Sequence, residues 1–236
     1  MLRYIGRRRV HNEGLRKYIE ENTRISKSTV FQGTLYEHTV MRELRDKLLI
    51  EKMEMCGGSY DAGVDIKGKW PLNKIYDAVN SSHGLTKDVP KRISVNGCSF
   101  KPLKHKLMAP APFKPLNVLV QCKAFKNTKI TGREMRELMG TYSLNVPSNK
   151  RNQTVFIMSA PNLLTRDGLL VMNSLAIPLI YARIEMLKSH QGWYDLEYSG
   201  KLQNYYENEY ASKLLDDCGI HEWLKSAAYK NYSDNA

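Results

Sequence analysis

Apolar and polar residues alternate along much of the chain with the periods of helices and strands. Residues 34–53 place Val40, Met41, Leu44 and Leu48 on one face, which predicts a helix. Strand-like runs are found at 64–67, 118–125, 154–158 and 177–181, and helical periods at 131–142 and 163–175. Because the strand, helix and strand of 154–181 follow one another, we expect a right-handed crossover to a parallel neighbour. The pattern predicts an α/β fold.

Three regions depart from this core pattern, which spans residues 28–187. Residues 1–27 begin Arg-rich and acid-free and are predicted to be a mitochondrial targeting segment or a basic tail. Residues 71–115 carry many lysines and several prolines, and are expected to be a basic flap over a nucleic-acid groove or a solvated insertion. Residues 188–236 are predicted to be a helical extension, because residues 205–215 and 220–229 look helical.

Two of the predicted strands carry polar residues where buried strands are normally apolar. Val64 and Ile66 alternate with Asp65, so Asp65 is expected to point away from both. The second run, Val118-Leu119-Val120, is apolar throughout and then places Gln121 and Lys123 on one face and Cys122 on the other. A carboxylate, an amide and an ammonium are therefore expected at the tips of central strands.

These polar groups are costly to bury unless they satisfy each other, a metal or a substrate. Asp65 and Gln121 offer the oxygen ligands that Mg²⁺ prefers, and a lysine beside a metal can position or deprotonate a water. The set predicts metal-assisted attack on a phosphodiester. The alternative is an ion pair between Asp65 and Lys123 that closes a strand end.

Glu37, on the same helical face as Val40, has two interpretations. Thr34-Leu35-Tyr36-Glu37 fits a capping box, in which Glu37 bonds back to the Thr34 amide. Glu37 could instead point to the edge of the core and join the metal site. Asp61, in the Gly-rich turn before Asp65, is a reserve acid or a turn residue.

The charge of the chain favours a polyanionic partner. Lys and Arg number 36 against 24 Asp and Glu, a net charge of +12, for which nucleic acid is the commonest partner and an anionic membrane surface the alternative. Lys126 and Lys129, with Arg133 in a predicted capping box at Thr131–Glu134, could contact phosphates or be ordinary surface charges. No apolar run approaches the length of a membrane-spanning helix. The four cysteines are scattered, which fits a reducing compartment.

The Gly-x-Asp before a strand, followed by an apolar strand ending in Gln121-Cys122-Lys123, resembles the PD-(D/E)XK nuclease superfamily, in particular its Mrr-like restriction endonuclease branch. In that branch Gln commonly replaces the acid at the position of Gln121. The resemblance covers about residues 34–184, interrupted by the insertion. The layout and N-terminus resemble most the fungal mitochondrial family named as required for respiratory growth, member seven.

The resemblance implies a restriction-endonuclease-like core, a central mixed sheet flanked by helices. It implies Mg²⁺ or Mn²⁺ held by Asp65, Gln121 and the backbone carbonyl of Cys122, with Lys123 at the attacking water and Glu37 at a second metal or bridging water. The expected function is a metal-dependent nuclease, or a protein derived from one, that acts on nucleic acid in the mitochondrial matrix and supports genome maintenance and respiratory growth. DNA is favoured over RNA as the partner, but the sequence does not decide between them. The alternative is a catalytically inactive nucleic-acid-binding or scaffold protein of the mitochondrial genome or translation apparatus. Neither the residues nor the resemblance indicates an oligomeric state.

Overall fold

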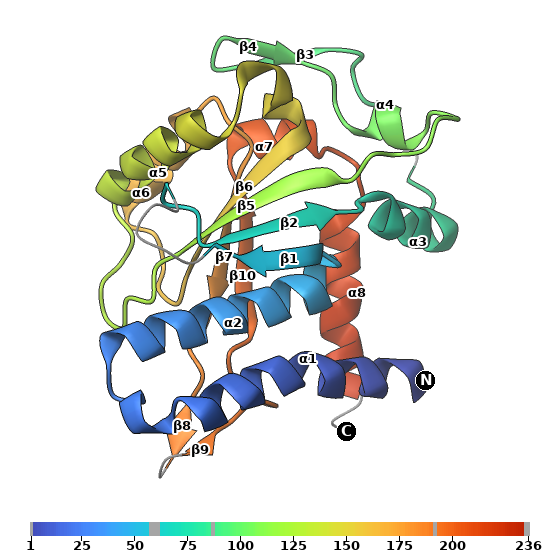
Figure 1. The fold of residues 1–236 in the computed structure, drawn as a ribbon. Coiled ribbons are helices and arrows are strands. Elements are labelled where there is room, and N and C mark those ends of the chain that lie inside the picture. The colour runs from blue at the N-terminus through green and yellow to red at the C-terminus, as the bar shows by residue number, and fades with distance from the viewer. Residues whose placement is uncertain (1, 57–61, 86–87, 191–192, 234–236) are drawn as a thin grey trace.

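A six-stranded mixed sheet forms the centre of the molecule (Figure 1). The computed structural model describes residues 2–56, 62–85, 88–190 and 193–233. In order across the sheet, the strands are β1 (Glu51–Met55), β2 (Ile66–Trp70), β5 (Leu116–Cys122), β6 (Thr154–Ala160), β7 (Leu179–Ile184) and β10 (Leu202–Glu207). Strands β5, β6 and β7 are parallel, and the other neighbours pair antiparallel. The predicted α/β class and the parallel pairing of β6 with β7 are confirmed.

Helices cover both faces of the sheet (Figure 1). Helix α2 (Thr29–Leu48) packs on one face, where its apolar residues share a core with Val118 and Val120 of β5. Helices α5 (Gly132–Asn145) and α6 (Arg166–Ser174) pack on the other face, in a core that contains Leu119. Because alternate residues of β5 enter different cores, the strand is apolar at every position from 118 to 120.

Helix α2 begins and ends earlier than the sequence predicts. Its N-cap is Ser28, whose hydroxyl accepts a hydrogen bond from the Phe31 N–H at 3.1 Å. The predicted capping box at Thr34 is therefore wrong, since Thr34 and Glu37 both lie inside the helix. The chain turns at Leu49, with φ of 56°, and continues as β1. The sequence pattern did not predict β1, because apolar residues continue past Leu49 and extend the apparent helix to residue 53.

The expected alternation around Asp65 holds only from Ile66 onward. Val64 is buried in the core on the α5 side, whereas Ile66 is buried in the core on the α2 side. Ala62 and Gly63 have φ values of 51° and 78°, so the chain is still turning just before Val64. Asp65 therefore does not oppose both neighbours, as the strand pattern predicted.

Residues 71–115 form a packed part of the domain. They contain helix α3 (Asn73–His83), the hairpin of β3 (Ile93–Val95) and β4 (Cys98–Phe100), and the short helix α4 (Lys104–Leu107). Apolar residues spaced along α3 and the hairpin enter the core on the α2 side: they are Leu72, Ile75, Val79, Val95 and Phe100. The prediction of a flap or solvated insertion is wrong for these elements, because they bury an apolar face against the sheet.

The C-terminal region belongs to the sheet as well as to the helical layer. Strand β10 pairs antiparallel with β7, so the predicted helix over residues 205–215 begins only at Glu209, the first residue of α7 (Glu209–Leu214). Before β10 lies a small hairpin of β8 (Ser189–His190) and β9 (Trp193–Tyr194), and after α7 comes α8 (Ile220–Ser233). The prediction of a purely helical extension is therefore wrong.

A buried charge pair on α2 holds the segment that leads into β10. Arg42, only 3% exposed, donates hydrogen bonds to the carbonyl oxygens of Leu196, Ser199 and Gly200 at 2.7–2.9 Å. Its guanidinium lies 3.2 Å from the Glu43 carboxylate, which accepts a hydrogen bond from the Leu202 N–H. Residues 196–202 are thus fixed to α2 immediately before the last strand.

Helix α1 (Leu2–Glu21) lies alongside α2 (Figure 1). Its Leu15, 2% exposed, packs with Phe31 and Leu35 of α2, and the short helix η1 (Thr23–Ile25) connects the two helices. Part of the segment predicted to be a targeting signal or tail therefore packs on the core, while targeting stays a prediction. Within the described ranges, no helix is both long and apolar enough to cross a membrane.

Candidate active site

The Asp65 carboxylate lies at the end of β5. Strand β2 runs antiparallel to β5, with Ile66 opposite Val120, so the start of one strand meets the end of the other. The Asp65 N–H donates to the Val120 carbonyl at 2.9 Å, and its side-chain Oδ2 accepts from the Cys122 N–H at 2.5 Å. These two bonds bring Asp65 next to the Gln121–Lys123 segment, whereas the roles predicted for Asp65, Gln121 and Lys123 stay predictions.

Gln121 is buried on the face of the sheet that α5 covers. It is 8% exposed, and its Oε1 is buried and accepts no hydrogen bond from the described part of the chain. Its Nε2 lies 3.5 Å from where a Cβ on Gly63 would stand, and Thr141 Oγ1 lies 2.6 Å from that point. An unsatisfied buried acceptor costs about 1–3 kcal/mol, so a cation or a donor bound here would stabilise the site.

The Cys122 thiol lies on the opposite face, near two carboxylates. Burial, followed by the negative charges of Asp65 and Glu37, raises the pKa of this thiol well above its ordinary value. Glu37 is half-buried on α2, and its neighbour Tyr36 donates a hydrogen bond to the Ile184 carbonyl at 2.8 Å. Tyr36 also hydrogen-bonds the Ser159 hydroxyl at 3.1 Å. These two bonds anchor α2 over the ends of the parallel strands and position Glu37 there.

Lys123 follows the last residue of β5. Its N–H donates to the Ser159 carbonyl at 2.8 Å, which continues the parallel ladder one residue past the strand. Its half-buried ammonium makes no hydrogen bond or ion pair with any residue that the structure describes. The alternative of an Asp65–Lys123 ion pair stays a prediction.

The structure thus brings together the backbone of Gln121–Lys123, the Asp65 carboxylate and the Glu37 charge. Gln121 and Cys122 face opposite sides, because successive residues of a strand alternate. Asp61 lies outside the described residues. Among the residues that are described, no three His, Cys, Asp or Glu side chains are grouped so that they could hold a metal ion.

Asp65 and Gln121 offer oxygen atoms of the kind that a weakly held Mg²⁺ or Mn²⁺ accepts, and a metal at this edge stays a prediction. Such an ion keeps several waters and needs only one or two carboxylates, in contrast to a closed protein cage. Asp65 supplies a carboxylate, and the buried Oε1 of Gln121 is a hard oxygen without a donor in the described chain. A cation at this edge would therefore satisfy an otherwise orphaned group.

The predicted phosphate-contacting residues lie on or after the loop that follows β5. Lys126 lines a hollow of about 880 Å³, described below, and Lys129 is exposed. Arg133 is also exposed, but its guanidinium lies 3.0 Å from the Glu137 carboxylate, which partly compensates its charge. Contact of these residues with nucleic acid stays a prediction.

Sequence reasoning missed a second basic surface, over β1, β2 and β5. A hollow of about 590 Å³ is lined by four lysines and one glutamate: Lys52, Lys67, Lys69, Lys150 and Glu54. The sequence does contain a signal, because Lys67 and Lys69 alternate with buried residues along β2 and so share one face.

Comparison with known proteins places the chain in a family. A family model described as "Required for respiratory growth protein 7" matches residues 28–215. The chain belongs to this family. Members named "Required for respiratory growth protein 7, mitochondrial" are 60% identical over 230 residues in Lachancea thermotolerans and 48% identical over 237 residues in Saccharomyces cerevisiae. These alignments cover 98% and 99% of this chain, and 90% and 98% of the two relatives. No solved structure matches the chain.

Proposed function

We propose that this member of the Required for respiratory growth protein 7 family is a metal-dependent nuclease with a restriction-endonuclease-like core. The observation that carries the proposal is the Asp65 carboxylate at the end of β5, bonded to the Cys122 N–H and flanked by Gln121 and Lys123. Acid, amide and ammonium come from two adjacent strands at one end of the sheet. This is the arrangement expected from the resemblance to the PD-(D/E)XK superfamily.

Each residue would have a distinct role. Asp65, the Gln121 amide and the Cys122 carbonyl oxygen would hold Mg²⁺ or Mn²⁺, which when bound stabilises negative charge on a phosphodiester. The Lys123 ammonium, which has no partner in the described chain, would orient the attacking water and face the developing charge. Glu37 would accept a proton or hydrogen bond from a water on the α2 side.

The substrate we propose is mitochondrial nucleic acid, with DNA favoured over RNA. The net charge of +12 and the four-lysine hollow beside β2 suit a polyanion. The relatives in Lachancea thermotolerans and Saccharomyces cerevisiae are named mitochondrial and required for respiratory growth. These names support the further proposal that the chain acts in the mitochondrial matrix, where cleavage would serve maintenance of the genome.

A second candidate is a protein that binds nucleic acid on this fold without cutting it. The observation that favours this candidate is the burial of the Gln121 Oε1 atom. In the described chain, no group of three His, Cys, Asp or Glu side chains is placed to hold a metal ion. In that case the lysine-lined hollows would carry the function and the strand-end groups would be vestigial.

The test is cleavage of labelled single- and double-stranded DNA and RNA with Mg²⁺ or Mn²⁺, with binding measured in the same samples. Asp65→Asn keeps an acceptor for the Cys122 N–H, and Lys123→Ala removes the ammonium. The exposed residues Asp88 and Lys213 supply the controls, Asp88→Asn and Lys213→Ala. We expect each site variant to lose cleavage about 100-fold or more while binding and melting temperature persist.

Binding without cleavage in any metal would support the second candidate. Cleavage that survives both Asp65→Asn and Lys123→Ala would refute the proposed site. A wild-type protein that neither binds nor cleaves any of the four substrates would refute both candidates.

A further inference from the structure

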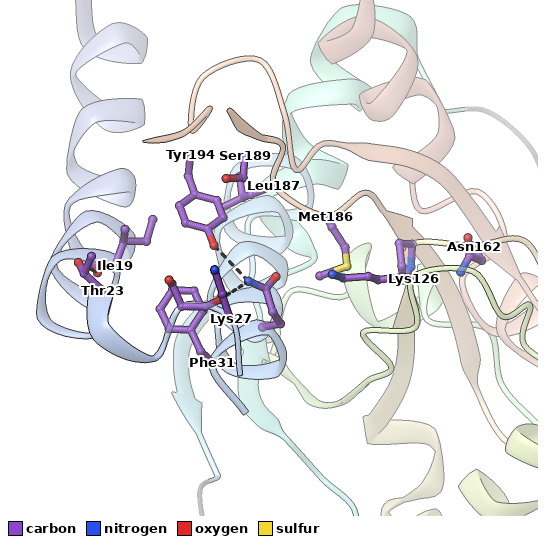
Figure 2. A pocket seen from close by; sticks show the side chains of 13 residues that line it. Ile19, Thr23, Lys27, Phe31, Lys126, Asn162, Met186, Leu187, Ser189 and Tyr194 are labelled. Atoms are coloured by element: carbon purple, nitrogen blue, oxygen red, sulfur yellow. Dashed lines mark hydrogen bonds between the residues drawn. The ribbon is translucent and has the colours of Figure 1, made fainter. Parts of the chain in front are cut away.

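A hollow of about 880 Å³ lies where the three parallel strands end (Figure 2). Its walls come from the connection between α1 and α2, the start of α2, the loop after β5, the end of β6 and the segment after β7. The carboxyl ends of parallel strands are where open α/β sheets commonly bind ligands. The volume is that of a site for a ligand of nucleotide size.

Two lysines give this hollow its charge. Lys27 and Lys126 line it from different segments, and none of its described lining residues is acidic. Neither ammonium forms an ion pair within the described ranges. Figure 2 shows the Lys126 side chain extending toward Met186, and Lys27 near Phe31 and Tyr194. The hollow therefore combines two uncompensated positive charges with an apolar and aromatic wall.

The loop that carries Lys126 is held in place by Asn162. The Asn162 Nδ2 donates to the carbonyl oxygens of Phe125 at 2.6 Å and Thr128 at 3.0 Å, one on either side of Lys126. The Tyr181 hydroxyl donates to the Asn162 carbonyl at 2.5 Å, which ties this loop to β7. The Lys126 backbone is thus positioned before any ligand binds, which lowers the entropic cost of binding.

The opposite wall is held by Gln32. Its Nε2 donates to the Ser26 carbonyl at 2.8 Å and to the Tyr194 hydroxyl at 3.1 Å, the two bonds drawn in Figure 2. These bonds fix the residue before Lys27 and connect the start of α2 to β9. Both lysines therefore come from backbone segments that hydrogen bonds restrain.

We propose that this hollow binds a nucleotide through its terminal phosphate, either the end of a nucleic-acid strand or a free nucleotide. A phosphate monoester carries a charge of about −1.5 to −2 at neutral pH and matches the two ammonium groups, whereas an internal phosphodiester carries only one charge. Hydroxyl groups of the lining can complete the phosphate contacts, and the apolar wall suits the sugar and base.

The hollow adjoins the candidate active site, so the inference rests on the proposed nucleic-acid function. Lys126 is three residues after Lys123, and Gln32 precedes Glu37 on α2 by five residues, about 7.5 Å along the helix. A strand whose end is held here would direct the adjoining phosphodiesters toward Asp65 and Lys123. The site would thereby prefer substrates with phosphorylated ends.

The test measures binding by fluorescence anisotropy in EDTA, where no metal-dependent cleavage occurs. Short single-stranded DNA is compared with a phosphate or a hydroxyl at the 5′ end, and separately at the 3′ end, with the label at the opposite end. We expect one phosphorylated end to bind roughly fivefold more tightly than its hydroxyl counterpart. Lys27→Ala and Lys126→Ala should each abolish this preference and reduce the slope of log K against log salt by about 0.7.

Lys213→Ala is the control, because Lys213 is exposed on α7 and lines neither hollow, so the preference should persist. Competition by a nucleoside monophosphate would identify a free nucleotide as a ligand, and competition by phosphorylated oligonucleotide alone would identify a strand end. Equal binding of phosphate and hydroxyl ends, or a preference that survives both lysine substitutions, would overturn the inference. Because metal is absent, a protein that proves unable to cleave can still show the end preference, and an active nuclease can lack it.

Discussion

Replacing Arg42 with methionine should destabilise the protein strongly. Methionine retains an unbranched side chain that matches the aliphatic part of arginine but removes the guanidinium that donates to the carbonyl oxygens of Leu196, Ser199 and Gly200. It also removes the cation beside Glu43, which is 2% exposed. Two buried acceptors and one part-buried acceptor would then lose their donor, and one buried carboxylate would lose its partner.

The expected loss in the free energy of unfolding follows from the burial of this ion pair. Removing one partner of a buried ion pair costs about 3–5 kcal/mol, because the remaining charge is left uncompensated. For a chain of 236 residues, 1 kcal/mol corresponds to about 2–4 °C, so the melting temperature should fall by about 6–20 °C. Lys201, whose ammonium lies 3.9 Å from Glu43, can offset part of the charge and favours the lower end of this range.

Urea unfolding followed by circular dichroism would measure the free energy of unfolding for Arg42→Met. Arg45→Met is the control, because Arg45 lies one turn along α2 and makes no hydrogen bond or ion pair with any described residue. Glu43→Gln in the Arg42→Met background should recover part of the loss, since it removes the orphaned charge. A loss below about 1 kcal/mol for Arg42→Met would refute the reasoning.

Three further predictions concern the turn before Asp65, a histidine pair and helix α1. Gly63→Ala should lower the free energy of unfolding by about 2 kcal/mol, because its φ is 78° and the new Cβ would lie 2.6 Å from Thr141 Oγ1. Adding Thr141→Ala should recover only the part of this loss that comes from the steric clash. An unchanged urea midpoint for Gly63→Ala would contradict the prediction. The Glu207 carboxylate, which lies 3.6 Å from His221 Nε2, raises the pKa of His221 by accepting from the imidazolium, so their interaction stabilises the fold below about pH 6.5 and is lost as pH rises through the folded pKa. His221→Asn should therefore lower the urea midpoint more at about pH 5.5 than at about pH 8.5, and equal shifts would exclude the pair. Deleting residues 1–27 should lower the melting temperature and increase binding of a hydrophobic dye, because Phe31 and Leu35 lose Leu15; equal melting of the full and shortened chains would show that α1 adds no stability.

Elements with strong local signals could be predicted from the sequence. The capping box at Thr131 and Glu134 is present, and it starts α5 at Gly132. Strands β5 and β6 are recognisable because both faces are buried and the runs are apolar. The packed elements within residues 71–115 could not be predicted with the same certainty, because short helices and strands separated by prolines become stable only against a distant core.

The candidate site likewise has features that the sequence predicts and features that it does not. The meeting of Asp65 with the end of β5 follows from the position of polar residues at strand tips, which is local information. The burial of Gln121 depends on Gly63 and Thr141, which come from separate segments. Arg42 and Glu43 look like a solvated helix face in the sequence. Their burial requires residues 196–202, which no pattern within α2 can reveal.

The bonds by which Arg42 and Glu43 of α2 hold residues 196–202 also constrain the order of folding. Arg42 and its acceptor Gly200 are 158 residues apart, and β10 is the last strand of the sheet in chain order. Contacts at such separation are slow to form, because a long loop must close before they contribute. Until residues 202–207 are available, β7 presents an unpaired edge on which another chain could add. A chain that is still being synthesised or translocated would therefore remain prone to aggregation until residues 202–207 can pair with β7. A chaperone that covers the β7 edge would shorten the time for which this edge is exposed.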